Sequence, residues 1–260
     1  MGSGTTERVF QNRYTEPVGL LHVAAASDNA NMNGAANALK TAASESAAAL
    51  VTDGMIVGLG SGSTAALAVS ALGRRVREGL RIVGIPTSET TAAQARALGI
   101  PLSSLTEVSQ IDITIDGADE VEDGTLNLIK GHGGALLREK IVANASKRLV
   151  IVVDDSKLVN QLAAKFPVPV EVVPFGWQAT AQQLSNLGAK PSLRRNIDGE
   201  PFVSDGGHYI LDCAFESTFS AVSIARELDH VVGVVEHGLF IGFTSEVHVA
   251  SAGGVRVLTS

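Results

Sequence analysis

The chain of 260 residues contains a single cysteine, Cys213, so an intrachain disulfide is excluded, which suits a reducing compartment. Long apolar runs are also missing, because the longest, such as residues 149–153, have strand length and fall far short of the ~18 residues of a membrane span. Basic charge is scarce, since 20 Lys and Arg stand against 27 Asp and Glu, a net charge of −7. We therefore expect no membrane segment and no nucleic-acid partner, which would need clustered Lys and Arg.

Hydrophobic residues make up 45% of the chain, which is enough for a sizeable core. Residues 1–34 lack apolar periodicity, and we predict a mobile N-terminal extension there. From residue 35 onward, helical stretches alternate with apolar strands: helices at 35–51, 64–72, 88–98 and 134–145, and strands at 55–59, 81–85, 111–115 and 149–153. Uniformly apolar strands separated by helices predict a doubly wound, mostly parallel sheet, that is, a Rossmann-like α/β domain.

The pattern changes near residue 167. Residues 167–239 show the order β-α-β-β-α-β, with a hairpin at Asp205-Gly206-Gly207, which predicts a second, smaller ferredoxin-like α+β domain. The tail is predicted to return to the first domain, which then comprises residues 35–166 and 240–260. Cys213 is expected to be a small buried strand residue of the second domain.

A Gly-rich loop, residues 58–64, links a predicted strand to a predicted helix. Free backbone N–H groups and the helix dipole converge on an anion at such a turn, so phosphate is the natural ligand. Hydroxyl groups add further donors at Ser61, Ser63 and Thr64. The alternative is a tight strand-to-helix turn with Ser or Thr capping, because the loop matches neither a Walker motif nor G-x-G-x-x-G.

Two further segments bring charged groups to strand ends. Asp116 and Asp119 follow an apolar strand and flank a Gly turn, which favours proton transfer between substrate oxygens or a divalent metal site; the alternative is local turn capping. Lys130 follows a short apolar run and precedes Gly131, Gly133 and a helix that carries Glu139. Glu139 taken alone is typical of a solvated surface charge, but a cation, a carboxylate and a phosphate loop together favour acid–base catalysis on a small anion. The histidines show no paired metal-ligand spacing.

Five separated blocks of the chain together resemble ribose-5-phosphate isomerase, type A: residues 58–65, 116–120, 130–140, 153–157 and 168–174. The likeness runs in order from about residue 35 to the C-terminus and leaves out residues 1–34. One departure is Gly131-His132-Gly133, where some members of the family have three glycines after the lysine. The His132 ring is expected to point to water.

The resemblance implies reversible conversion of D-ribose 5-phosphate to D-ribulose 5-phosphate in the pentose phosphate pathway, through an enediolate and with no metal or organic cofactor. It implies that Glu139 moves a proton between C2 and C1, that Lys130 stabilises the oxyanion, and that Asp116, assisted by Asp119, moves protons among the sugar oxygens. The substrate-binding residues that it implies are Lys40, Ser61, Gly62, Ser63, Thr64, Asp116, Gly117, Ala118, Asp119, Lys130, Gly131, His132, Gly133 and Lys157.

The resemblance also implies a homodimer or homotetramer in the cytoplasm, or in a plastid if residues 1–34 are a targeting remnant. Two other classes of function stay open at this stage. A sugar-phosphate sensing domain would bind the same ligand without turnover, although the acidic chain shows no basic helix-turn-helix. A sugar-phosphate deaminase or acyl-CoA transferase would keep the phosphate loop but would have no use for the segment from Lys130 to Glu139.

Overall fold

The computed structural model describes residues 1, 34, 37–216 and 220–259. The chain divides into two compact units, Met1–Asn37 and Ala38–Ser260, and the description below concerns the second. The N-terminal extension predicted for residues 1–34 lies, apart from its two end residues, outside the described part of the chain. Among the described helices, none combines the length and the apolar character needed to cross a membrane.

A six-stranded sheet with the order β14-β13-β6-β3-β1-β2 forms the larger part of this unit. All neighbouring strands pair in parallel except β14, which is antiparallel to β13 at the edge. The strands are β1 (Ile56–Leu59), β2 (Val83–Pro86), β3 (Ile113–Asp116), β6 (Leu149–Asp154), β13 (Glu246–Ser251) and β14 (Gly254–Thr259). The predicted α/β class with a mostly parallel sheet is confirmed, and β13 and β14 come from the C-terminal tail.

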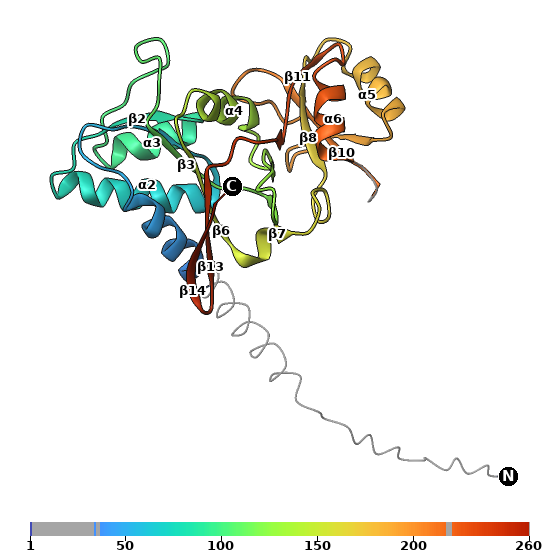
Figure 1. The fold of residues 1–260 in the computed structure, drawn as a ribbon. Coiled ribbons are helices and arrows are strands. Elements are labelled where there is room, and N and C mark those ends of the chain that lie inside the picture. The colour runs from blue at the N-terminus through green and yellow to red at the C-terminus, as the bar shows by residue number, and fades with distance from the viewer. Residues whose placement is uncertain (2–33, 35–36, 217–219, 260) are drawn as a thin grey trace. The chain divides into compact units, whose positions relative to one another are not determined.

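Both faces of this sheet are covered, which explains why its strands are apolar throughout. In β6, Val150 and Val152 pack into one core with helical residues 39–48 and α2 (Gly62–Arg77). The alternate residues Leu149, Ile151 and Val153 pack into a second core. The remaining helices of this part are α3 (Glu89–Ala97) and α4 (Leu136–Asn144). Figure 1 shows α2 and α4 near the parallel strands.

Helix α2 runs five residues beyond its predicted end at Leu72, through Gly73 to Arg77. Glycine weakens a helix because it leaves more backbone freedom in the unfolded chain. Here the glycine serves packing, since a Cβ at Gly73 would lie only 2.8 Å from the Cβ of Leu98. The close approach of the segment after α3 therefore outweighs the local propensity.

A second, antiparallel sheet has the order β11-β8-β10-β9. It contains β8 (Val168–Val172), β9 (Lys190–Leu193), β10 (Tyr209–Ala214) and β11 (Val234–His237), with helices α5 (Trp177–Asn186) and α6 (Ala221–Leu228) between them. The chain order is β-α-β-β-α-β, as predicted for the ferredoxin-like part (Figure 1). Cys213 is fully buried in this core, also as predicted.

A third, small sheet was not predicted. It has the order β12-β5-β4-β7 and consists of β4 (Glu120–Glu122), β5 (Leu128–Ile129), β7 (Leu158–Val159) and β12 (Leu239–Phe240). Strands this short carry no periodicity that a sequence pattern can reveal. The sheet nevertheless matters for the site, because β4 begins directly after Asp119 and β5 ends directly before Lys130. A backbone hydrogen bond of 2.8 Å from Asp119 N to Ile129 O ties the two together.

Candidate active site

The polar loops lie where the order of the parallel sheet reverses. From β1 the chain passes to β2 on one side and then returns across β1 to β3 on the other side. Such a switch point leaves a crevice at the carboxyl ends of the two strands, where open α/β sheets bind ligands. The loop after β1 carries Gly60 and Ser61, and the loop after β3 carries Gly117 to Asp119.

A pocket opens at this edge. Its lining residues are Lys40, Ser61, Gly62, Ser63, Thr64, Gly117, Ala118, Asp119, Lys130, Gly131, Gly133, Glu139 and Lys157. Every one of them belongs to the set of site residues that the family resemblance implies. Two members of that set, Asp116 and His132, lie outside the lining.

Asp116 ends β3 and lies behind Lys130 rather than at the wall of the pocket. Its Oδ1 accepts hydrogen bonds from Ser61 N at 3.1 Å and Gly117 N at 2.8 Å, and its Oδ2 is 3.0 Å from Lys130 Nζ. Gly60 makes this arrangement possible, because a Cβ there would lie 2.3 Å from Asp116 Oδ1. The Gly-rich loop by itself marks only a turn at Gly60, and the contact with Asp116 of β3 reveals why glycine is needed there.

Lys130 joins the two carboxyl groups of the cluster. Its Nζ donates to Gly117 O at 2.6 Å and lies 3.0 Å from Asp116 Oδ2 and 3.2 Å from Glu139 Oε2. Only 3% of the residue is exposed. Burial by itself lowers the pKa of Lys130, but the charges of Asp116 and Glu139 outweigh it and raise the pKa above its usual value. The ammonium therefore stays protonated.

Glu139 lies in the first half of α4 and is 5% exposed, so the reading of an isolated surface charge does not hold. Burial raises the pKa of Glu139 to about 8; Lys130 lowers it, while Asp116 and Asp119 raise it further. Its Oε2 has the 3.2 Å ion pair with Lys130 but no hydrogen bond of good geometry. Such a carboxyl group can take up and release a proton near neutral pH.

The opposite end of the pocket suits an anion. Gly62, Ser63 and Thr64 form the first turn of α2, and the N-cap residue Ser61 makes no side-chain cap hydrogen bond. The backbone N–H groups of this turn, together with the helix dipole, attract negative charge. Two cations flank them: Lys40, whose Nζ is 3.3 Å from Ser63 Oγ, and Lys157, whose Nζ is 5.0 Å from the centre of the Phe166 ring.

The Ser61 hydroxyl has a different role from the donor predicted for it. Its Oγ bonds with Thr87 Oγ1 at 2.7 Å and Ser88 Oγ at 2.8 Å, which ties the loop after β1 to the loop after β2. Ser88 is also the N-cap of α3, and its side chain accepts a hydrogen bond from Thr91 N. The anion end therefore offers backbone N–H groups and the hydroxyls of Ser63 and Thr64.

His132 also differs from expectation. Its backbone N–H donates to Asp119 Oδ2 at 3.0 Å, but its ring does not point to water. The ring is half-buried, lies edge-on to Phe166 with 4.7 Å between ring centres, and has Nε2 3.3 Å from Pro167 O. The expectation failed because the loop packs against the segment that leads into β8, which is remote in sequence.

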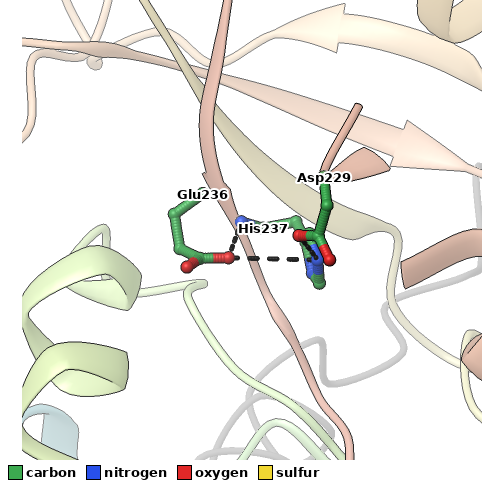
Figure 2. A group of neighbouring side chains, drawn as sticks. All are labelled: Asp229, Glu236 and His237. Carbon is green, nitrogen blue, oxygen red and sulfur yellow. Dashed lines mark hydrogen bonds and ion pairs between the residues drawn. The ribbon is translucent and has the colours of Figure 1, made fainter. Parts of the chain in front are cut away.

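A second charged cluster, formed by Asp229, Glu236 and His237 (Figure 2), lies outside the lining of the pocket. One potential ligand atom from each residue lies within 4.8 Å of the others, a spacing that could hold a metal ion. However, Lys140 Nζ lies 2.6 Å from Glu236 Oε1 and already balances its charge. Burial and the positive charge of Lys140 lower the pKa of His237 to about 4. The cluster is a satisfied ion-pair network.

The fold and the pocket together define an α/β protein with a proton-transfer site and an anion site at a topological switch point. Comparison with known proteins gives the family. Residues 83–254 match the family model for ribose 5-phosphate isomerase A (phosphoriboisomerase A). A ribose-5-phosphate isomerase A from Gloeobacter violaceus is 60% identical over 221 residues, covering 85% of this chain and 96% of that protein.

Solved structures agree with the sequence comparison. Ribose 5-phosphate isomerase A from Methanocaldococcus jannaschii is 41% identical with a TM-score of 0.82, covering 85% of this chain and 98% of that one. A D-ribose-5-phosphate isomerase in complex with phospho-erythronic acid is 38% identical with a TM-score of 0.83, at the same coverage of 85% and 98%. The chain therefore belongs to the ribose 5-phosphate isomerase A family.

Proposed function

We propose that this chain interconverts D-ribose 5-phosphate and D-ribulose 5-phosphate through an enediolate, as a step of the pentose phosphate pathway. The observation that carries the proposal is the buried carboxyl group of Glu139, 3.2 Å from Lys130 Nζ, in a pocket that also contains the N-terminus of α2. The reaction needs a base for a carbon-bound proton, a cation for the oxyanion and an anion site for the phosphate. One pocket supplies all of them.

In the proposed reaction, Glu139 takes the proton from C2 of the open-chain aldose. The electron pair of that C–H bond forms the C1–C2 double bond, and the carbonyl electrons move to O1, where Lys130 stabilises the negative charge. Glu139 then returns the proton to C1 while the O2 proton moves to O1 with the help of Asp119, which leaves a hydroxyl group on C1 and the ketone at C2. A pKa of about 8 suits both directions, because the carboxylate can accept the proton and the carboxylic acid can donate it.

The two aspartates have separate roles in this scheme. Asp119 lines the pocket and moves protons among the sugar oxygens, including those that open the furanose ring. Asp116 lies behind Lys130, and its Oδ2, 3.0 Å from Nζ, keeps the ammonium charged and in place. This revises the expectation that Asp116 acts on the sugar directly.

The phosphate binds at the first turn of α2, between Lys40 and Lys157. Support comes from the uncapped N-terminus of α2 and from the relative solved with phospho-erythronic acid, which carries a phosphate and a carboxylate. We expect this acid to compete with D-ribose 5-phosphate for the pocket, since its carboxylate can take the place of the charged enediolate oxygens beside Lys130.

Proton NMR in D₂O tests the proposal. With D-ribose 5-phosphate, an isomerase incorporates solvent deuterium at C1 of the ketose as the ketose appears, whereas a sensing domain gives neither ketose nor deuterium. Glu139→Gln should stop both signals while the fold persists. Glu171→Gln is the matched control, because Glu171 is also a buried glutamate, 1% exposed, but lies outside the pocket. An absence of ketose with wild-type protein would refute the function.

We further propose a homodimer or homotetramer located in the cytoplasm. Each subunit of this oligomer would contain two domains. Residues 35–166 together with 240–260 would form the first domain, and residues 167–239 would form the second. Size-exclusion chromatography with light scattering tests the assembly, and a monomer at working concentration would contradict it. Limited proteolysis tests the division, because cleavage should concentrate near residues 166 and 240.

A further inference from the structure

One arginine of the second sheet reaches the glycine loop of the pocket. Arg194 directly follows β9, and its Nη1 donates to Gly131 O at 2.8 Å and to His132 O at 3.0 Å. Its Nε donates to Asp212 Oδ2 at 3.0 Å, and Nη2 bonds to the other carboxylate oxygen of Asp212. The side chain is 13% exposed, so these bonds are shielded from water. A planar guanidinium paired with a carboxylate holds its remaining donors in one direction.

The geometry of the loop shows what these bonds control. In a trans peptide the C=O and N–H groups point in opposite directions within one plane. The Gly131–His132 peptide has its oxygen on Arg194 and its N–H on Asp119 Oδ2, at 3.0 Å. Arg194 and Asp119 therefore hold the two sides of a single peptide plane.

The next peptide, His132–Gly133, also has its oxygen on Arg194, so its N–H points away from Arg194. Gly133 lines the pocket, and within the described part of the chain its N–H has no hydrogen-bond acceptor. An oriented N–H without a partner at the wall of a reaction pocket is the arrangement that stabilises developing negative charge.

The loop would not hold this orientation by itself. Gly131 has φ +109° and Gly134 has φ +81°, values that glycine adopts with little restraint. The segment between β9 and β10 supplies the restraint: besides Arg194, Phe202 packs against Gly134 so closely that a Cβ there would lie 2.3 Å from its ring. Lys130 directly precedes the restrained segment, and Glu139 follows it in α4.

We propose that Arg194 is a positioning residue for the isomerase reaction: it orients the peptides of Gly131 to Gly133 so that the Gly133 N–H meets the oxygen that becomes negative in the enediolate. The inference rests on the proposed isomerase function. Arg194 does not line the pocket, and it acts through the loop. It lies 64 residues after Lys130 in the sequence, and no motif links the two.

The test measures kcat and KM for Arg194→Met and Arg194→Lys, together with the urea midpoint of unfolding. Arg194→Met should lower kcat by about 10²-fold, because it displaces the Gly133 N–H, whose contact with the substrate oxygen strengthens in the transition state. KM should change little, because the phosphate site at the first turn of α2 is untouched. Arg194→Lys keeps the charge but not the fork of donors, and should lose about 10-fold. Arg195→Met is the matched control, since Arg195 is exposed and donates to Gly199 O.

Asp212→Asn adds a second line of evidence, because it loosens the guanidinium without touching the loop. It should lower kcat as well. In the double variant with Arg194→Met, the fold-loss in kcat should be smaller than the product of the fold-losses of the two single variants. Three results would overturn the positioning role. They are an unchanged kcat in Arg194→Met, a loss of kcat in Arg195→Met as large as that in Arg194→Met, and a loss of kcat in Arg194→Met that is explained entirely by the fraction of unfolded protein. Wild-type protein without isomerase activity would instead refute the proposed function, so the two failures are distinguishable.

Discussion

Two buried lysines of this protein lie near the same aromatic ring and yet behave differently. Lys130 Nζ is 5.6 Å and Lys140 Nζ is 5.0 Å from the centre of the Phe240 ring. The pKa of Lys130 is raised, whereas burial lowers the pKa of Lys140. Both are largely removed from water, so the difference comes from the number of carboxylates beside each lysine.

Lys130 has two carboxyl groups within 3.2 Å, those of Asp116 and Glu139, while Lys140 has one such partner, Glu236 at 2.6 Å. One cation cannot balance two buried anions, so the first cluster retains a proton that Glu139 holds with a pKa of about 8. In the second cluster the largely buried carboxylate of Glu236 faces one cation, Lys140, while the other carboxylate, Asp229, is 60% exposed to water. Where buried carboxylates outnumber cations, one carboxyl group titrates near neutral pH. Where one buried carboxylate faces one cation, the two form a static ion pair.

The same substitution in both clusters should separate chemistry from stability. Glu139→Gln should lower kcat by about 10³-fold and leave the fold intact, because an amide cannot accept a carbon-bound proton. Glu236→Gln should leave kcat close to wild type but lower the free energy of unfolding by about 1–3 kcal/mol, since Lys140 loses its charged partner. Steady-state kinetics and urea unfolding of both variants provide the check. Near-normal turnover in Glu139→Gln would remove Glu139 from the mechanism.

Replacing the lysines tests the other half of each cluster. Lys130→Met removes the cation that faces the oxyanion and should lower kcat by about 10²- to 10³-fold. Lys140→Met should act on the free energy of unfolding instead, and only weakly on kcat. Both kcat and the free energy of unfolding are measured on one preparation of each variant. The same ratio of the loss in kcat to the loss in free energy of unfolding in both variants would contradict the different roles of the two lysines.

The pH dependence of activity should follow the unbalanced cluster. The base is active as the carboxylate, and the pKa of Glu139 is raised to about 8, so kcat/KM should increase with pH up to about 8 and then level off. Below that value the loss should approach tenfold per pH unit. Lys130 stays protonated throughout, because its pKa is raised. A profile that is flat between about pH 7 and pH 9 would place the proton elsewhere.

The smallest expected effect concerns ground-state binding. Lys157 lies at the anion end of the pocket, and Lys157→Ala should raise KM by about 5- to 10-fold with kcat nearly unchanged, because the lost contact is present before and during the reaction. Lys190→Ala serves as the control, since Lys190 has a largely exposed side chain outside the pocket. A defect in kcat alone would assign Lys157 to the chemistry.

Local pattern was sufficient for much of the site. Ser61 lies in the loop after β1, and Asp119 lies in the loop after β3. Because β1 and β3 are parallel neighbours, their carboxyl ends lie at the same edge of the sheet, and both residues line the pocket there. The Gly131-His132-Gly133 loop was visible as well, since glycines mark a turn wherever it packs. Uniformly apolar strand-length runs that alternate with helical stretches likewise indicated the parallel sheet and its helices.

Contacts between distant segments were beyond such reasoning. Gly60 is required by Asp116, the His132 ring rests on Phe166, and Arg194 reaches the glycine loop from the second sheet. Each pair is separated by at least 34 positions in the chain, and neither partner carries a pattern that names the other. The small sheet was missed for a related reason, because two-residue strands gain their stability from their neighbours and not from their own sequence.

The amino-acid sequence alone determined the order of helices and strands, the α/β class and the set of polar residues at the strand ends, because each depends on local periodicity and turn chemistry. The tertiary structure decided which charges are buried together. Arg138-Glu139-Lys140 reads as a solvated triplet in the sequence, yet in the fold Glu139 and Lys140 are buried in separate clusters. A pKa depends on burial and on neighbouring charges, and only the packed chain sets both.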